Sequence, residues 1–243
     1  MSTQLSSKQQ LSRIAAIIYQ YLRLPLSDEN IPGSFLEGVL AHVRDGERLN
    51  TYDFVDVINR EEKIGWQIKS TKESTPVTWK RAKIPNSAQL IKASHESQKN
   101  LQQLGTAIIN FCNQHAEESI QRYGLDEIYY SRLITFDNGS IKYFERKLCD
   151  KNNPQMFDPN AYEWKWSTPK SPSKKEQLSA LHGIDRQSRK KVWAWHGLGE
   201  NQLHFSGESE WWGEKANSYI EFRYPPPNQR LTLEKLVALL EGL

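Results

Sequence analysis

Two short apolar segments joined by a polar turn constrain this fold most. Tyr52–Ile58 is rich in β-branched and aromatic residues, Asn59–Lys63 has turn composition, and Ile64–Ser70 again favours a strand. Such residues suit a pleated, half-buried surface better than a helix. The sequence therefore predicts a β-hairpin about fifty residues from the first methionine.

Helical periodicity surrounds this hairpin. Apolar residues recur at helical spacing over 8–23 and again from Ser34 to about Arg44, where Ser34 is a suitable N-cap. A longer periodic stretch, from Ser87 to about Arg122, predicts one long helix or a broken pair, and Gly124 is placed to end it. The basic segment between Pro76 and Pro85 is expected to be irregular.

Strands dominate the rest of the chain. Ile128–Phe136 and Ile141–Leu148 flank an Asp-Asn-Gly turn, which is a strong hairpin signal. Shorter strands are expected at 192–196, 202–206 and 219–224, before a closing helix at 231–240. We therefore expect an α/β core over residues 1–150 and a β-rich C-terminal elaboration over residues 151–243, packed on that core rather than forming an independent domain.

Composition excludes several classes of protein. The chain has 243 residues, 25% of them charged, and its mean hydropathy is -0.71. No apolar run is long enough for a membrane helix, and the first ten residues do not resemble a signal peptide. Two cysteines, Cys112 and Cys149, are too few for a disulfide framework or a cysteine-rich zinc site. We expect a cytoplasmic protein with reduced thiols and no membrane partner.

Positive charge is concentrated in two segments. Residues 165–191 contain eight basic and two acidic residues, and a second cluster follows the first hairpin. Because duplex DNA is a dense polyanion, such clusters favour nucleic-acid binding. The predicted DNA contacts are Lys72, Lys80, Arg81, Lys83, Lys174, Lys175, Arg186, Arg189 and Lys190.

The first hairpin also carries a chemically coherent set of side chains. Because strand side chains alternate between faces, Gln67 and Lys69 share a face, and Asp53 is expected across from them. Carboxylate and amide oxygens suit Mg²⁺, while a lysine can orient or deprotonate an attacking water. A shift of register would exchange Asp53 for Asp56. Glu37, on the preceding helix, is a further candidate carboxylate.

This arrangement resembles the PD-(D/E)xK nuclease superfamily, which includes most type II restriction endonucleases. The likeness rests on Asp53, on Gln67-Ile68-Lys69 in the variant Q-x-K form, on Glu37 and on the helix after residue 86, and it covers roughly residues 34–136. It implies a restriction-endonuclease-like core with a mixed sheet between helices. It also implies a Mg²⁺ site formed by Asp53, Gln67 and Ile68, with Asp53, Gln67, Lys69 and Glu37 as catalytic residues.

The function implied is a Mg²⁺-dependent, sequence-specific endonuclease that hydrolyses double-stranded DNA, recognises its target through the C-terminal elaboration, and acts as a homodimer, with a cognate DNA methyltransferase as a possible partner. Two alternatives stay open. One is a modification-dependent or repair nuclease with a base pocket lined by tryptophans, six of which fall between Trp164 and Trp212. Core packing is the simpler explanation of alternating tryptophans. The other alternative is a DNA-binding protein that does not cleave.

Overall fold

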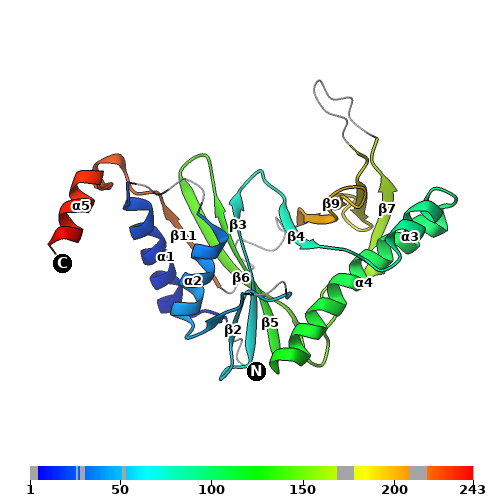
Figure 1. Ribbon diagram of the computed structural model, residues 1–243, viewed down its shortest axis with the longest axis horizontal. Helices are drawn as coiled ribbons and strands as arrows, with labels where there is room; N and C mark the ends of the chain where they lie inside the picture. Colours follow the sequence, from blue (N-terminus) through cyan, green and yellow to red (C-terminus); the bar gives the residue numbers. More distant parts are fainter. Residues whose placement is uncertain are drawn as a thin grey trace. The chain divides into compact units, whose positions relative to one another are not determined.

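The computed structural model describes residues 5–25, 27, 31–50, 53–168, 178–207 and 218–242. These form a mixed α/β structure with two sheets (Figure 1). The chain divides into two compact units. Unit 1 comprises residues 1–75, 120–150 and 212–243, and unit 2 comprises residues 76–119 and 151–211. The units interleave along the chain, so they do not follow the division expected at residue 150.

Unit 1 is built on a six-stranded sheet in the order β1-β2-β3-β5-β6-β11. Its strands are β1 (Glu47–Arg48), β2 (Val57–Asn59), β3 (Ile64–Lys72), β5 (Glu127–Thr135), β6 (Ser140–Asp150) and β11 (Ser218–Arg223). Strands β3 and β5 are parallel, and the other neighbours are antiparallel. This sheet contains β2 and β3, the two strands of the first predicted hairpin.

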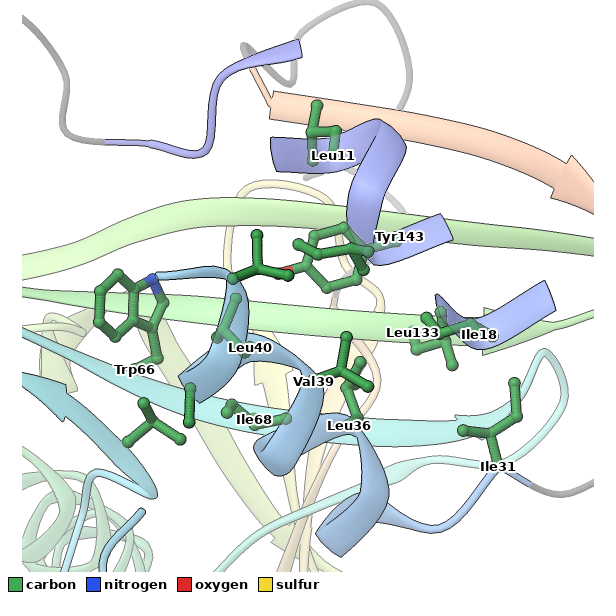
Figure 2. Packing of buried hydrophobic residues seen from close by; sticks show 14 of the residues in the cluster. Leu11, Ile18, Ile31, Leu36, Val39, Leu40, Trp66, Ile68, Leu133 and Tyr143 are labelled. Atoms are coloured by element: carbon green, nitrogen blue, oxygen red, sulfur yellow. The ribbon is translucent and has the colours of Figure 1, made fainter. Parts of the chain in front are cut away.

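Helices α1 (Lys8–Arg23) and α2 (Gly33–Val43) cover one face of this sheet (Figure 1). Leu36, Val39 and Leu40 of α2 pack against Trp66 and Ile68 of β3, all at most 4% exposed (Figure 2). The capping box at Ser7 and Gln10 fixes the start of α1. The predicted cap at Ser34 is wrong, because α2 begins one residue earlier and its N-cap is Pro32, which makes no side-chain cap bond.

A buried polar network crosses the same core. Glu145 of β6 is 1% exposed and accepts hydrogen bonds from the Ser6 hydroxyl and from the Tyr143 hydroxyl, both at 2.7 Å. Arg44 lies 3.8 Å from Glu145 and pairs with Glu62 at 2.8 Å. These partners compensate the burial of charge on the helix-covered face.

Unit 2 contains a five-stranded sheet in the order β4-β10-β9-β8-β7. Its elements are β4 (Val77–Arg81), α3 (Ser87–Ser94), most of α4 (Gln98–Tyr123), β7 (Tyr162–Trp166), β8 (Leu181–Asp185), β9 (Lys191–Trp195) and β10 (Gln202–Phe205). Trp79, Trp164, Trp193 and Trp195 are all at most 1% exposed. The alternating tryptophans of β9 therefore belong to the core of this unit.

Three expectations about individual elements are corrected. Residues 76–85 are not irregular, because β4 buries Val77 and Trp79 in alternation and pairs with the distant β10. The strand expected from Tyr52 begins only at Val57, with residues 53–56 forming a bend. Of the two alternatives for 87–122, the broken pair is found, and the Ser97 hydroxyl accepts the backbone N–H of Asn100 where α4 begins.

The chain ends in a short helix, α5 (Leu233–Glu241), which belongs to unit 1. Thr232 caps it by accepting the backbone N–H of Lys235. Single 3-10 turns occur at Pro159–Ala161 and Pro227–Gln229.

Candidate functional site

Strand β3 presents Gln67 and Lys69 on the face that α1 and α2 do not cover. Trp66 and Ile68 point into the core beneath α2, so the alternating Gln67 and Lys69 point to the other face (Figure 2). Gln67 is 1% exposed, while Lys69 is partly exposed. On this face, the amide of Gln67 is therefore buried, while Lys69 is accessible to solvent.

The segment before β2 lies on this same face. Gly65 alternates with Trp66, and a Cβ atom built on Gly65 would meet the side chains of Val55 at 2.8 Å and Leu125 at 2.7 Å. Any residue other than glycine at position 65 would force the side chains of Val55 and Leu125 to move. Glycine at position 65 thus lets the 53–56 bend lie against the Gln67 side of β3.

Asp53 is held by the C-terminal turn of α4. Its carboxylate accepts a hydrogen bond from the Tyr123 hydroxyl at 2.5 Å and forms a close ion pair with Arg122. The side chain of Asp53 is 16% exposed, and that of Arg122 is 58% exposed. The hydrogen bond and charge of Asp53 raise the pKa of Arg122. The carboxylate of Asp53 is therefore held in one orientation by Arg122 and Tyr123, the last two residues of α4.

Asp56 has a different place. Its Oδ2 accepts the backbone N–H of Ile68 at 2.7 Å, and its own backbone N–H donates to the carbonyl of Trp66 at 2.8 Å. The carboxylate thus takes the position that a main-chain carbonyl would occupy in a continued ladder. This hydrogen bond accompanies the start of β2 at Val57, and it makes Asp56 a partner of the β3 backbone.

Glu37 is not brought to Gln67 and Lys69. It lies on α2, which covers the opposite face of the sheet, and its carboxylate pairs with Arg48 at 3.1 Å. Of the four predicted catalytic residues, Gln67 and Lys69 lie on the face of β3 that α1 and α2 do not cover, and Glu37 lies on the opposite side of the sheet. Asp53 is held by Arg122 and Tyr123 at the end of α4.

The donor set that the sequence predicts has the chemistry of a hard-cation site. The Asp53 carboxylate, the Gln67 amide oxygen and the Ile68 carbonyl are oxygen ligands of the kind that Mg²⁺ prefers, with water completing the shell. Within the described ranges, no group of three or more His, Cys, Asp and Glu side chains is arranged to hold a metal. The predicted donor set contains one carboxylate, and such a set would bind Mg²⁺ weakly in the absence of a phosphate.

Two arginines on the same face were not anticipated from the sequence. Arg132 of β5 stands beside Lys69 in the parallel register, is 2% exposed, and donates to the Thr71 hydroxyl at 2.7 Å. Arg146 of β6 stands beside Tyr130, and burial lowers its pKa. A charged residue inside the apolar run Ile128–Phe136 is the sequence signal that could have identified Arg132.

The predicted DNA contacts are spread over both units. In unit 1, Lys72 lines a cavity of about 310 Å³ together with Asp137 and Arg230. In unit 2, Lys80 and Arg81 lie on β4, and Lys83 is exposed just after it. Lys174 and Lys175 lie outside the described residues.

The remaining predicted contacts lie at the turn between β8 and β9. Arg186 donates to the carbonyl of Asn160 at 3.0 Å, and Arg189 pairs with Glu163 at 2.9 Å. Lys190 is exposed beside them. Two of these three side chains therefore tie the turn to the start of β7.

The cysteines are both buried and free. Burial raises the pKa of each thiol to about 12, so neither is a reactive thiolate near neutral pH.

Comparison of the chain with protein-family models, with curated proteins and with solved structures finds no match. Among the helices that the structure describes, none combines the length and the apolar character needed to cross a bilayer.

Proposed function

We propose that this protein is a Mg²⁺-dependent endonuclease that hydrolyses phosphodiester bonds in double-stranded DNA. One observation carries the proposal: Gln67 and Lys69 project from the same face of β3 against which the Asp53 segment packs. The order of elements along the chain, α2, β2, β3, α4 and β5, is also that of the restriction-endonuclease-like core which the sequence resembles.

Each residue has a defined role in this proposal. Asp53, Gln67 and the Ile68 carbonyl hold the cation, which when bound polarises the phosphorus centre and supplies hydroxide near neutral pH. Lys69 orients the attacking water and offsets negative charge on the phosphate in the transition state. Arg132, beside Lys69 in the sheet, adds positive charge to the same face. Hydrolysis leaves a 5′-phosphate and a 3′-hydroxyl.

The wider features of the proposal follow from the resemblance. Unit 2 and the basic residues on it recognise the target sequence, and a homodimer cuts the two strands of a palindromic site. The enzyme is proposed to work in the cytoplasm, with a DNA methyltransferase protecting the host DNA.

A DNA-binding protein that does not cleave is the second candidate, and the Asp53–Arg122 ion pair favours it. A carboxylate already neutralised by arginine has less affinity for Mg²⁺ than a solvated one. The modification-dependent nuclease gains no comparable support, because Trp164, Trp193 and Trp195 are buried in the core of unit 2 rather than lining a base pocket.

The test compares three proteins on unmethylated phage DNA with and without Mg²⁺. The proposal expects discrete fragments from the wild type only when Mg²⁺ is present. Lys69→Ala should bind the DNA as well as the wild type and cut at least about 10²-fold more slowly, the usual loss for a proton-transfer group. Lys99→Ala, which removes an exposed lysine from α4 in unit 2, is the matched control and should cut normally.

The alternatives give different results in the same assay. DNA that is shifted in a gel but never cut supports the non-cleaving protein. Cutting restricted to methylated DNA supports the modification-dependent nuclease. Equal loss of binding and cleavage in Lys69→Ala would show that the substitution disrupts the fold and would remove Lys69 from the mechanism.

A further inference from the structure

The exposed face of the unit 2 sheet carries a cluster of histidines that the proposed nuclease site does not use. Residues directly opposite in an antiparallel sheet share a face. The cross-strand row runs from Lys165 through His182, Ala194 and His204 to Thr78. Ala194 lies between His182 and His204, and its small side chain leaves space between the two imidazole rings.

A cavity of about 620 Å³ opens over this row. His182 and His204 line it, together with a third histidine, His196, whose ring centroid is 5.1 Å from that of His204. Donors from neighbouring segments complete the lining: Ser167, Thr168, Lys191 and Gln202. All of these residues belong to unit 2.

Basic side chains outnumber the acidic one in the lining of this cavity. Burial lowers the pKa of His182, and the charges of Lys191, His196 and Lys165 lower it further. Burial and His196 also lower the pKa of His204, while Glu200 acts in the opposite direction. Arg81 stands opposite Gln202 on the same face. Lys191 of β9 and His196 after β9 line the cavity itself, Lys165 and Arg81 lie on the neighbouring strands β7 and β4, and Glu200 is the acidic lining residue.

We propose that this cavity binds a phosphate monoester, with Lys191, His182 and His204 as its main ligands. Lysine, imidazolium and hydroxyl donors converging on a concave site match a compact dianion, because charge-assisted hydrogen bonds are the strongest available. Ser167 accepts the backbone N–H of Ala180 at 2.8 Å, which leaves its hydroxyl proton to donate. The phosphate can be that of a mononucleotide or the 5′-phosphate at a DNA end, and the site is separate from the Asp53–Lys69 face.

Binding is expected to be coupled to proton uptake. An anion between His182 and His204 raises the pKa of both, so the complex holds more protons than the free protein. Linkage then makes binding tighter as the pH falls from 8 to 6, by up to about tenfold per pH unit for each proton taken up. Below a pH of about 6, the phosphate itself takes up a proton and loses charge, so the affinity increases less in that range.

The experiment follows the histidine ring protons by NMR while ligand is added in EDTA, which excludes bridging metal ions. Inorganic phosphate and a deoxynucleoside 5′-monophosphate should shift the His182 and His204 signals, and the unphosphorylated deoxynucleoside should not. Two oligonucleotides that differ only in a 5′-phosphate separate the two sources. A preference for the phosphorylated one assigns the site to DNA ends, and a response to the mononucleotide alone assigns it to free nucleotides.

Two variants test the ligands. His204→Gln keeps a polar side chain of similar size and should weaken binding about tenfold, the loss of one charge-assisted hydrogen bond. Lys191→Ala alters an exposed side chain and should weaken it similarly without affecting the fold. His42→Gln, on the exposed side of α2 in unit 1, is the control and should bind normally. Equal affinity for phosphorylated and unphosphorylated ligands, or unchanged binding in both variants, would overturn the proposal.

Discussion

The cores of the two sheets of this protein are built by different chemistry. The unit 1 sheet packs aliphatic side chains of α1 and α2 against β3 and includes a buried ionic network around Glu145. The unit 2 sheet packs aromatic rings against one another: Trp193 meets Trp79 and Phe157 edge to face, and Phe205 at a tilt. On each sheet, the face opposite the described core carries the candidate functional side chains. These are Gln67, Lys69 and Arg132 in unit 1 and His182 and His204 in unit 2.

In both units, the packing of the core residues determines where the alternating functional side chains point. On β3, the core residues Trp66 and Ile68 alternate with Gln67 and Lys69, so packing against α2 fixes where the candidate metal site points. On β8 to β10, the buried Leu181, Trp193 and Leu203 alternate with His182, Ala194 and His204. A rigid core on one face thus orders a functional face on the other, whether the core is aliphatic or aromatic.

The largest expected effect is on the aromatic core. Trp193→Ala should lower the free energy of unfolding by about 3–5 kcal/mol, because it removes a fully buried indole from the centre of four ring contacts and leaves a cavity. Urea unfolding followed by circular dichroism measures the change. A loss below about 1 kcal/mol would mean that the rings can rearrange and that the aromatic core is not closely packed.

Gly105 provides a smaller and more local test. A Cβ atom at this position in α4 would lie 2.2 Å from the Trp164 ring. Gly105→Ala should therefore destabilise the protein by about 1–3 kcal/mol despite the better helix propensity of alanine. Gly38→Ala in α2, where nothing lies within 4 Å of the added carbon, should stabilise it instead. Equal effects of the two substitutions in thermal unfolding would contradict the close packing of Trp164.

The polar network of unit 1 should respond more weakly. Tyr143→Phe removes the hydroxyl that donates to Glu145 and accepts from Ser131 at 2.8 Å. We expect a loss of about 1 kcal/mol in the free energy of unfolding, the net value of a typical buried hydrogen bond. No change at all would indicate that Ser6 and Arg44 satisfy Glu145 without the tyrosine.

The smallest effect is that of pH on unit 2. Since His182 and His204 have lowered pKa values in the folded protein, the unfolded chain binds more protons just below the ordinary value of 6.5. The free energy of unfolding should therefore decrease as the pH falls through 6.5, and the decrease should end below the pKa values of the folded state. Adding phosphate should reduce this decrease, and the double variant His182→Gln with His204→Gln should lack it.

Much of the fold could be predicted from local patterns. The helix over 8–23 and the turn at Asp137–Gly139 are found as expected, with Gly139 at φ +80° where an L side chain is disfavoured. Strand β4 was missed because its pairing partner, β10, is far away in the sequence. Strands β7 and β8 were also missed, because these short strands are defined by their pairing with each other across residues 167–180.

The candidate site was predictable only in part. Period-two alternation correctly placed Gln67 and Lys69 on one face of a strand. It could not show that Asp53 sits in a bend and is held by Arg122, because that contact joins residues 69 positions apart. Nor could it separate the roles of Asp53 and Asp56, which depend on where the pairing of β2 with β3 begins.

The most direct test of the central claim is divalent cation binding at the Asp53 carboxylate, measured by electron paramagnetic resonance with Mn²⁺ replacing Mg²⁺. We expect the signal of free Mn²⁺ to decrease when wild-type protein and DNA are added together. Asp53→Asn should abolish this decrease, and Arg122→Gln should enhance it by removing the positive partner of the carboxylate. If Asp53→Asn binds Mn²⁺ as well as the wild type does, the cation does not lie on this face and the nuclease proposal loses its basis.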